Sequence, residues 1–297
     1  MLTKRVELQY IKEFDSYGIP KSVLLELFKE KVLADIRLPD KILKEKENTP
    51  LLGFLLGQDM STDGTDYYTI SPTYLEAMKN TGANICFLDY DNPVAQTQKC
   101  HGIVLPGGIF DFPKDYFIKN ENLGKEIGKR FFAYKNIIEN AYKDHKPMLG
   151  ICAGAQMLGC VLSNIKMYLY INKEVGSSIK HKPTEKGEIC LHKLKFYEKT
   201  PILQIMGISS TDEVQMNSRH EQAMVLKTFE QKKALVKMSV YAVSEGDNIP
   251  EIWGNDKESI LCVQGHPEDL AANGDNAMQN LYNYVAKRAM LYKQQHK

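Results

Sequence analysis

The stretch 148-MLGICAGAQML-158 joins a short apolar run to a helical pattern through one cysteine that lies between two glycines. A nucleophile elbow has this form: a strand, a reactive residue in a strained turn, and a helix. The turn leaves no room for side chains two residues before and after the nucleophile, and Gly150 and Gly154 flank Cys152 at that spacing. The sulfur would then face the N-terminus of the helix, where the helix dipole favours a thiolate. The alternative is an inert core cysteine at a tight turn.

Strand-like and helical patterns alternate on the N-terminal side of this elbow. Short apolar runs predict strands over 51–57, 84–90, 102–108 and 147–152. Helices are expected over 71–83, with Ser71 as N-cap and Pro72 at the first position, over 123–145, and over 155–162 after the elbow. This order predicts an α/β fold with a central, mostly parallel sheet and functional loops at the carboxyl ends of its strands.

The C-terminal part of the chain is richer in strand patterns. Strands are expected over 188–197, 213–217, 235–244, 249–254 and 259–268, followed by an amphipathic helix over 275–294. Residues 1–49 differ from the rest because they are polar and lysine-rich, with one amphipathic helical pattern over 22–38. We therefore predict an N-terminal helical extension over 1–49, which either packs on the main domain or binds a partner, and a catalytic domain over 50–297.

The composition excludes several classes of protein. The 297 residues are 43% hydrophobic and 25% charged, and 38 basic against 37 acidic residues give a net charge of +1. Mixed charges provide no basic patch, so we expect no nucleic-acid partner. We find neither a secretory apolar region nor a run long enough to cross a bilayer, and the six cysteines form no C-x-x-C pair. We expect a cytoplasmic, soluble protein with reduced thiols and no membrane partner.

A thiolate nucleophile needs a base, and the base needs an orienting group. The segment 262-CVQGHPE-268 provides both directly after an apolar run. Pro267 biases His266 toward an extended conformation, in which residues two apart project to the same side. The Glu268 carboxylate would then accept a hydrogen bond from the His266 ring and fix its tautomer.

Acyl transfer also requires backbone N–H groups that stabilise an oxyanion. Ala153, the residue after the nucleophile, would provide one donor. The segment 105-LPGGIFDFP-113 would provide the other, because Gly107 and Gly108 let backbone amides approach a substrate without interference from side chains. The alternative is that these glycines only form a tight turn.

A zinc site is the one metal site that the sequence suggests. Cys190 and His192 are two residues apart, and His181 lies upstream. No fourth ligand stands at a spacing typical of zinc sites, so we expect no metal and no cofactor.

Four blocks of the chain together resemble a class I glutamine amidotransferase domain. The blocks are 102-GIVLPGGIFDFP-113, 147-PMLGICAGAQMLG-159, 214-VQMNSRHEQAM-224 and 262-CVQGHPE-268, and the resemblance covers about Leu51 to Glu268. Within this superfamily the chain is most similar to the gamma-glutamyl hydrolases of peptidase family C26, including the gamma-glutamyl-gamma-aminobutyrate hydrolases. The resemblance implies a flavodoxin-like α/β/α sandwich and a Cys-His-Glu catalytic triad.

The resemblance assigns roles residue by residue. It implies that Cys152 is the nucleophile, His266 the base and Glu268 its orienting group, with Gly108 and Ala153 forming the oxyanion hole. Further residues resemble positions that line the family's substrate site; these are Gly107, Gln156, Asn217, Ser218, Arg219 and His220. Gln156 is expected to contact the glutamyl part of the substrate.

Two residues depart from the family pattern. Arg219 stands where the family often has an apolar residue; it could bind a second substrate carboxylate or point outward, and we expect the latter. Gly265 stands where an aromatic residue is common, which would open space beside His266 and alter the pocket for the acyl acceptor.

The resemblance implies a cysteine hydrolase that cleaves a small-molecule gamma-glutamyl amide through a thioester on Cys152. Two alternatives stay open: a glutaminase component that delivers ammonia to a separate synthase, and a non-enzymatic regulatory protein on the same scaffold. The sequence leaves open the released amine, the pathway, and whether the chain forms a homodimer.

Overall fold

The fold is described from a computed structural model of the chain. The structure describes residues 49–60, 66–90, 92–108, 112–119, 127–185, 188–209, 212–230 and 234–296. The predicted helical extension lies outside the described residues, except for Thr49. Among the helices described, none is long and apolar enough to cross a membrane.

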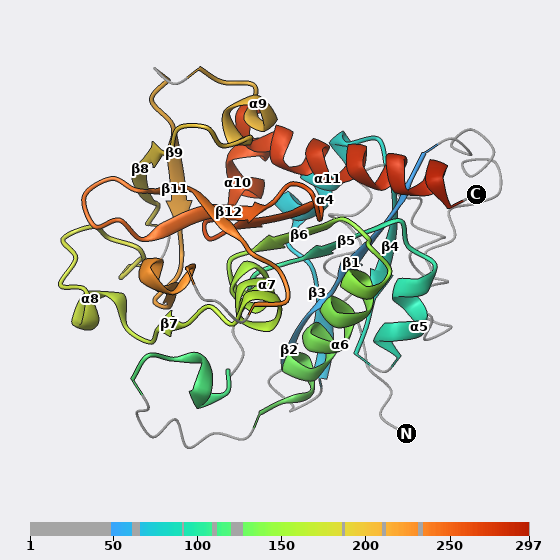
Figure 1. The fold of residues 1–297 in the computed structure, drawn as a ribbon, viewed down its shortest axis with the longest axis horizontal. Helices are drawn as coiled ribbons and strands as arrows, with labels where there is room; N and C mark the ends of the chain where they lie inside the picture. The colour runs from blue at the N-terminus through green and yellow to red at the C-terminus, as the bar shows by residue number, and fades with distance from the viewer. Residues whose placement is uncertain are drawn as a thin grey trace.

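A large mixed sheet runs through the described part of the chain (Figure 1). Its parallel half consists, in spatial order, of β4 (Asn84–Leu88), β1 (Leu51–Leu55), β5 (Gly102–Leu105), β6 (Met148–Ile151) and β13 (Ile260–Val263). Its antiparallel half continues with β12 (Pro250–Asn255), β11 (Ser239–Ser244), β8 (Cys190–Phe196) and β9 (Gln215–Ser218). All residues of β5, β6 and β13 are buried, as expected for central strands covered on both faces.

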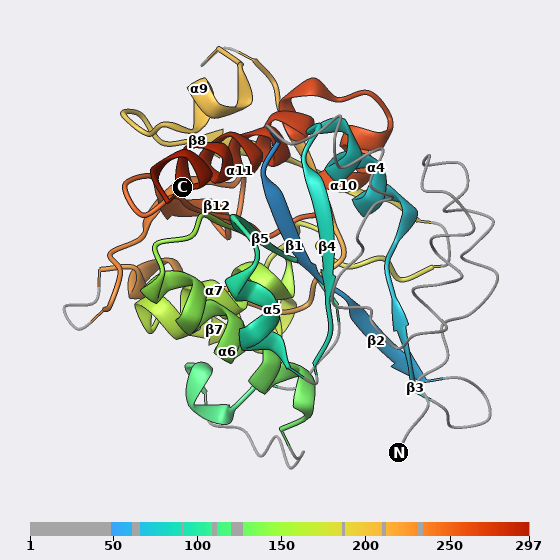
Figure 2. The same cartoon turned by 90° about the vertical axis from the view of Figure 1, so that its right-hand side faces the viewer.

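Helices cover both faces of this sheet (Figure 2). One layer contains α4 (Pro72–Asn80), α9 (Ile202–Met206), α10 (Pro267–Ala272) and α11 (Asn276–Gln295); the other contains α5 (Pro93–Gln98), α6 (Lys129–Lys143) and α7 (Ala153–Ser163). Within each layer the helices pack against one another, and α11 and α7 contact the central strands. The predicted flavodoxin-like α/β/α sandwich is therefore confirmed.

Smaller elements decorate the sandwich. They are the hairpin of β2 (Gly57–Met60) and β3 (Asp66–Thr69), the pair β7 (Met167–Tyr168) and β10 (Ala223–Met224), α8 (Ile171–Glu174), and the 3₁₀ turns η1 (Lys114–Tyr116) and η2 (Leu226–Thr228). The sequence patterns did not indicate any of them as separate elements.

Helix α5 is the main element that the patterns missed. Its two buried residues, Gln96 and Thr97, are polar, so the segment shows no apolar stripe. The helix is held instead by Gln96, whose Nε2 donates to Asp89 Oδ1 at 2.7 Å and whose Oε1 accepts from the Asp89 backbone N–H at 2.9 Å. Helix-period analysis detects apolar burial and does not detect polar anchoring of this kind.

Three neighbouring parallel strands bring the predicted catalytic segments to one edge of the sheet. Cys152 follows β6 directly, Gly107 and Gly108 lie just beyond the end of β5, and His266 lies just beyond the end of β13. Because β5, β6 and β13 are adjacent and parallel, their carboxyl ends meet.

Candidate active site

Cys152 occupies a strained turn between β6 and α7. Its backbone angles are φ 51° and ψ −113°, a conformation that non-glycine residues rarely adopt, and its N–H donates to the carbonyl of Val263 at 2.7 Å. The two flanking glycines are required by contact: a Cβ on Gly154 would overlap the carbonyl of Leu105, and one on Gly150 would lie 2.8 Å from the backbone of Ala155. The turn therefore has the local geometry of a nucleophile elbow.

His266 lies beside this cysteine. A Cβ placed on Gly107 would stand 2.9 Å from Cys152 Cβ and 3.0 Å from His266 Cε1, so both side chains border the same point above the glycine. His266 Nδ1 is 2.7 Å from Glu268 Oε1, and the hydroxyl of Tyr282 donates to the other carboxylate oxygen at 3.5 Å. Glu268 is fully buried. The structure thus brings the three predicted catalytic residues together.

The pKa of His266 is strongly perturbed. Burial lowers the pKa of this imidazole, but the negative charges of Glu268 and of a Cys152 thiolate, and hydrogen bonding to both groups, raise it to about 10. The imidazole therefore holds a proton at neutral pH.

The contact between His266 and Glu268 arises from a different backbone geometry than we expected. We predicted an extended strand end, but His266 is the N-cap of α10 and Pro267 its first residue, with Glu268 in the first turn. Proline at the first helical position starts a helix readily, because its missing N–H has no intrahelical partner there. The helix N-terminus also favours the negative charge of Glu268.

Ala153 and Gly108 are the candidate backbone donors near Cys152. Ala153 is the first residue of α7, where N–H groups have no partner within the helix. Gly108, with φ 146°, borders the same cavities as Cys152. The N–H of Gly107 donates to the Tyr74 hydroxyl at 3.0 Å, so within this loop Gly108 is the better candidate for an oxyanion donor.

Two polar residues that the sequence analysis missed, the half-buried Arg130 and the buried Tyr134, hold this loop. Arg130 donates to the carbonyl of Gly107 at 2.9 Å and to the Tyr134 hydroxyl at 3.2 Å, and Tyr134 donates to the carbonyl of Pro106 at 2.8 Å. Arg130 and Tyr134 lie one turn apart on α6, so they share one face of the helix. A charged residue one turn before a buried aromatic residue was the signal in the sequence that could have indicated this contact.

Two cavities meet at Cys152. The larger, about 330 Å³, is lined by Phe54, Gly57, Ile70, Ser71, Tyr74, Pro106, Gly107, Gly108, Cys152, Arg219 and His266. The smaller, about 230 Å³, is lined by Gly108, Phe112, Cys152, Ala153, Gln156, Lys182, Arg219, His220, Glu221 and Gln222. Cys152 thus borders one cavity lined largely by apolar and aromatic residues and a second that is lined by more charged residues.

The predicted substrate residues differ in where they point. Gln156 borders the charged cavity, and its Nε2 donates to the carbonyl of Gln222 and to the side chain of Gln264. Asn217 donates to Asp269 at 3.0 Å, and Ser218 is buried and donates to the carbonyl of His181 at 2.8 Å. Asn217 and Ser218 therefore support the site from behind instead of lining either cavity.

The ring nitrogens of His220 are both occupied by contacts within the protein. The residue lines the charged cavity, but its Nδ1 lies 2.9 Å from the carbonyl of Gln222 and its Nε2 lies 3.6 Å from Glu251. Both ring nitrogens thus face protein atoms behind the cavity.

Both departures from the family pattern differ from what we expected. The side chain of Arg219 is 47% exposed, but it does not simply point outward: its guanidinium lies 2.9 Å from Asp269 and 3.5 Å from Glu268, at the mouth of both cavities. Gly265 opens no space, because a Cβ there would overlap the side chain of Met216, which fills the position. The glycine therefore accommodates a neighbouring strand, and the pocket beside His266 is not enlarged.

Cys152 is expected to be alkylated at least about 10-fold faster than the other five cysteines at pH 7. It borders both cavities beside a protonated His266, whereas burial raises the pKa of Cys160 and of Cys262. A time course with iodoacetamide, followed by peptide mass spectrometry of the folded protein, measures all six rates. Equal labelling of the six would contradict an activated sulfur at position 152.

The chain has relatives in family and in fold. The peptidase C26 family matches residues 54–268. A GMP synthase component from Thermoplasma acidophilum aligns with 83% of this chain and 98% of its own, at 14% identity and a TM-score of 0.53. The glutaminase domain of Trypanosoma brucei CTP synthase, solved with bound acivicin, aligns with 80% of this chain and 94% of its own, at 16% identity and a TM-score of 0.55. No curated protein matches the chain in sequence. At these identities the solved structures indicate a shared fold.

Proposed function

The chain belongs to the peptidase C26 family of hydrolases, and from that premise we propose that it cleaves the gamma-glutamyl amide bond of small conjugates with Cys152 as nucleophile. One observation carries the proposal: Cys152 and His266 border the same point above Gly107, and Glu268 holds the far side of the imidazole at 2.7 Å. A strained cysteine, a base and an orienting carboxylate in this order are what acyl transfer to sulfur requires.

The acylation step follows from this arrangement. The Cys152 thiolate attacks the gamma-carbonyl carbon, and the oxyanion that forms accepts hydrogen bonds from the N–H groups of Ala153 and Gly108. Collapse of this intermediate breaks the C–N bond, and the amine leaves with the proton that His266 carried. The products are a gamma-glutamyl thioester on Cys152, a free amine and a neutral imidazole.

The perturbed pKa of His266 suits the second step. Part of the rise in this pKa comes from the thiolate charge, and that contribution vanishes when the sulfur becomes a thioester. The pKa of His266 then falls, so the neutral imidazole can take a proton from water as the water attacks the thioester. Departure of the thiolate releases glutamate and restores the charged pair. One histidine thus acts as acid and then as base.

The two cavities suit the two halves of such a substrate. In the charged cavity, Lys182 and Glu221 form an exposed ion pair at 2.8 Å, and together they match the opposite charges of a glutamyl alpha-carboxylate and alpha-amino group. The other cavity is lined by Phe54, Ile70 and Tyr74, which favour a leaving amine with an apolar portion. We propose that the glutamyl group occupies the first cavity and the amine the second.

A panel of conjugates tests this assignment. We expect the purified full-length chain, without any partner, to release glutamate from gamma-glutamyl amides of alkyl and aryl amines. The kcat/KM for these should exceed that for glutamine by about 10-fold or more, because each apolar group buried in a pocket contributes selectivity of this size. The isomeric alpha-glutamyl amides are the matched control, and they should not be cleaved.

Other outcomes of the panel separate the alternatives. Turnover of glutamine alone, or only after a partner is added, would favour a glutaminase that serves a separate synthase. No turnover of any conjugate, with Cys152 still selectively alkylated, would overturn the proposed reaction and leave a binding protein on this scaffold.

A further inference from the structure

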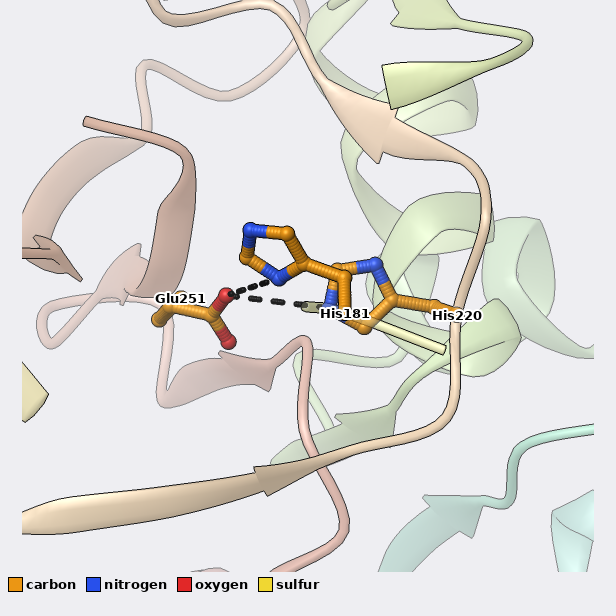
Figure 3. A group of neighbouring side chains, drawn as sticks. All are labelled: His181, His220 and Glu251. Carbon is orange, nitrogen blue, oxygen red and sulfur yellow. Dashed lines mark ion pairs between the residues drawn. The ribbon is translucent and has the colours of Figure 1, made fainter. Parts of the chain in front are cut away.

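A cluster of buried histidines around one carboxylate adjoins the charged cavity, which His220 also lines; Figure 3 shows His181, His220 and Glu251 of this cluster. His181 follows α8, His220 follows β9, and Glu251 belongs to β12; the exposed fractions of the three residues are 2%, 4% and 0%. His192, on β8, is buried beside them, with its ring centroid 4.9 Å from that of His181. The proposed catalytic steps use none of these four side chains.

One nitrogen of each imidazole is directed at Glu251. His181 Nδ1 and His220 Nε2 each lie 3.6 Å from Glu251 Oε1, and His192 Nε2 lies 3.1 Å from the same oxygen. For His181, His220 and Glu251, these ligand atoms all lie within 4.8 Å of one another. In Figure 3, two of the rings converge on the carboxylate from different segments of the chain.

Outer hydrogen bonds fix which nitrogen carries the proton. His220 Nδ1 lies 2.9 Å from the carbonyl of Gln222, which can only accept, so the hydrogen sits on Nδ1. His181 Nε2 lies 2.8 Å from the Asp247 carboxylate, which also accepts hydrogen bonds from Ser177 and Ser244. In their neutral forms, both rings therefore turn a lone pair toward Glu251.

Lone pairs that face a carboxylate repel it, and the nitrogens of His181 and His220 accordingly stay 3.6 Å from Glu251 Oε1, beyond hydrogen-bond distance. Within the described part of the chain, several buried polar atoms at this place make no hydrogen bond of acceptable geometry, although His192 Nε2 approaches Glu251 to 3.1 Å; the atoms are His181 Nδ1, both nitrogens of His192, His220 Nε2 and both carboxylate oxygens of Glu251. Buried polar groups are ordinarily satisfied, because each unsatisfied one costs about 1–3 kcal/mol. A concentration of acceptors that share one centre is the arrangement a cation would satisfy.

We propose that this cluster is a structural metal site for a divalent transition ion, zinc above others, with Glu251 and the inward nitrogens of His181, His192 and His220 as its ligands. Three imidazoles and one carboxylate match the ligand types and the number found in four-coordinate zinc sites. The hydrogen bonds from His181 to Asp247 and from His220 to Gln222 are the outer contacts that orient such ligands.

The charges support a divalent ion. One divalent cation, the Glu251 carboxylate and the Asp247 carboxylate sum to zero when the three histidines are neutral. The sequence suggested zinc through Cys190, His192 and His181, although we expected no metal; the two histidines belong to the cluster, and Cys190 does not.

The proposed site connects to the cavity through the segment that it would hold. The carbonyl of Gln222 accepts from both His220 Nδ1 and Gln156 Nε2, so the cluster and the cavity share one backbone group. The N–H of His220 and the hydroxyl of Ser218 both contact the carbonyl of His181. A bound ion would thus fix residues 217–222, including Arg219 at the cavity mouth.

Metal analysis of the full-length chain, with any affinity tag removed, tests the proposal. We expect about one equivalent of zinc per chain, and after extraction with a chelator we expect added zinc to raise the Tm by about 5–10 °C. The cobalt-substituted protein should show the visible absorption of a tetrahedral site without a thiolate charge-transfer band.

Variants of the ligands locate the ion. Glu251→Gln and His181→Gln should each lose the bound metal and the rise in Tm, whereas His145→Gln, on the surface, and Cys190→Ser should keep both.

If a ligand variant does not fold, extraction of the metal from the natural chain and its replacement still test the proposal. Less than about a tenth of an equivalent of metal, with no change in Tm on adding zinc, cobalt or nickel, would overturn the proposal. Metal retained in folded Glu251→Gln would also overturn it. Metal content is measured without substrate, so these outcomes are independent of the proposed hydrolase activity.

Discussion

Replacing Cys152 with alanine is expected to lower the kcat for gamma-glutamyl hydrolysis by about 10⁴-fold or more, because nothing else near His266 can form the thioester. The residual rate would reflect binding and the oxyanion donors alone. The substitution removes one sulfur from a site that is 7% exposed, and alanine tolerates the φ of 51° about as well as cysteine does. The measurement is glutamate release from the best conjugate of the panel, with the Tm of each variant as a test of folding.

Cys160→Ala is the matched control. Cys160 lies two turns later on the same helix, is similarly buried, and makes a hydrogen bond to the carbonyl of Ile165. We expect it to keep more than about half of the activity while losing about 1 kcal/mol of stability. Cys152→Ala protein that keeps more than a tenth of the natural rate would show that the sulfur is not the nucleophile.

The elbow could be predicted because its constraints are local. The turn at Cys152 leaves no room for a side chain two positions before or after the cysteine. Gly150 and Gly154 satisfy this requirement, and they can be recognised from the sequence alone. His266 and Glu268 could also be paired from sequence, since they are two residues apart, although the helix start that joins them was not foreseen. The parallel strands were recognisable because complete burial produces continuous apolar runs.

Features that depend on distant segments could not be predicted. Met216 fills the place beside Gly265, and a missing side chain says nothing about which neighbour takes its space. His192, His220 and Glu251 come from three strands or strand ends in the antiparallel half of the sheet, whose spatial order the patterns do not specify. Their spacing along the chain matches no metal motif, and only the fold brings them together.

Replacing Glu268 with glutamine is expected to lower kcat/KM by about 10³–10⁴-fold, because the negative charge that favours the His266 imidazolium is lost. Glutamine has nearly the same shape, so the buried position and the contact with the Tyr282 hydroxyl are kept.

The second measurement for this variant is the pH dependence of Cys152 alkylation. In the natural protein His266 keeps its proton until the pH approaches about 10. In the variant the pKa of His266 falls, so less imidazolium stands beside Cys152 and the alkylation rate at pH 7 should be lower than in the natural protein.

Asp269→Asn distinguishes this effect from a general loss of negative charge in α10. Asp269 follows Glu268 in the same helix turn and pairs with Arg219 at 2.9 Å; it meets His266 only through the backbone, where its N–H donates to the carbonyl of His266 at 3.3 Å, and among the described residues no contact joins its carboxylate to the imidazole. Its pair with Arg219 is partly exposed, so we expect a loss of less than about 10-fold and an unchanged pH profile of alkylation. If Glu268→Gln and Asp269→Asn reduce the rate equally, the carboxylate of Glu268 contributes only to the general negative electrostatic potential at the site and has no specific effect on His266. If the alkylation profile of Glu268→Gln matches the natural one, Glu268 does not control the charge of His266, and the base must be oriented by another group.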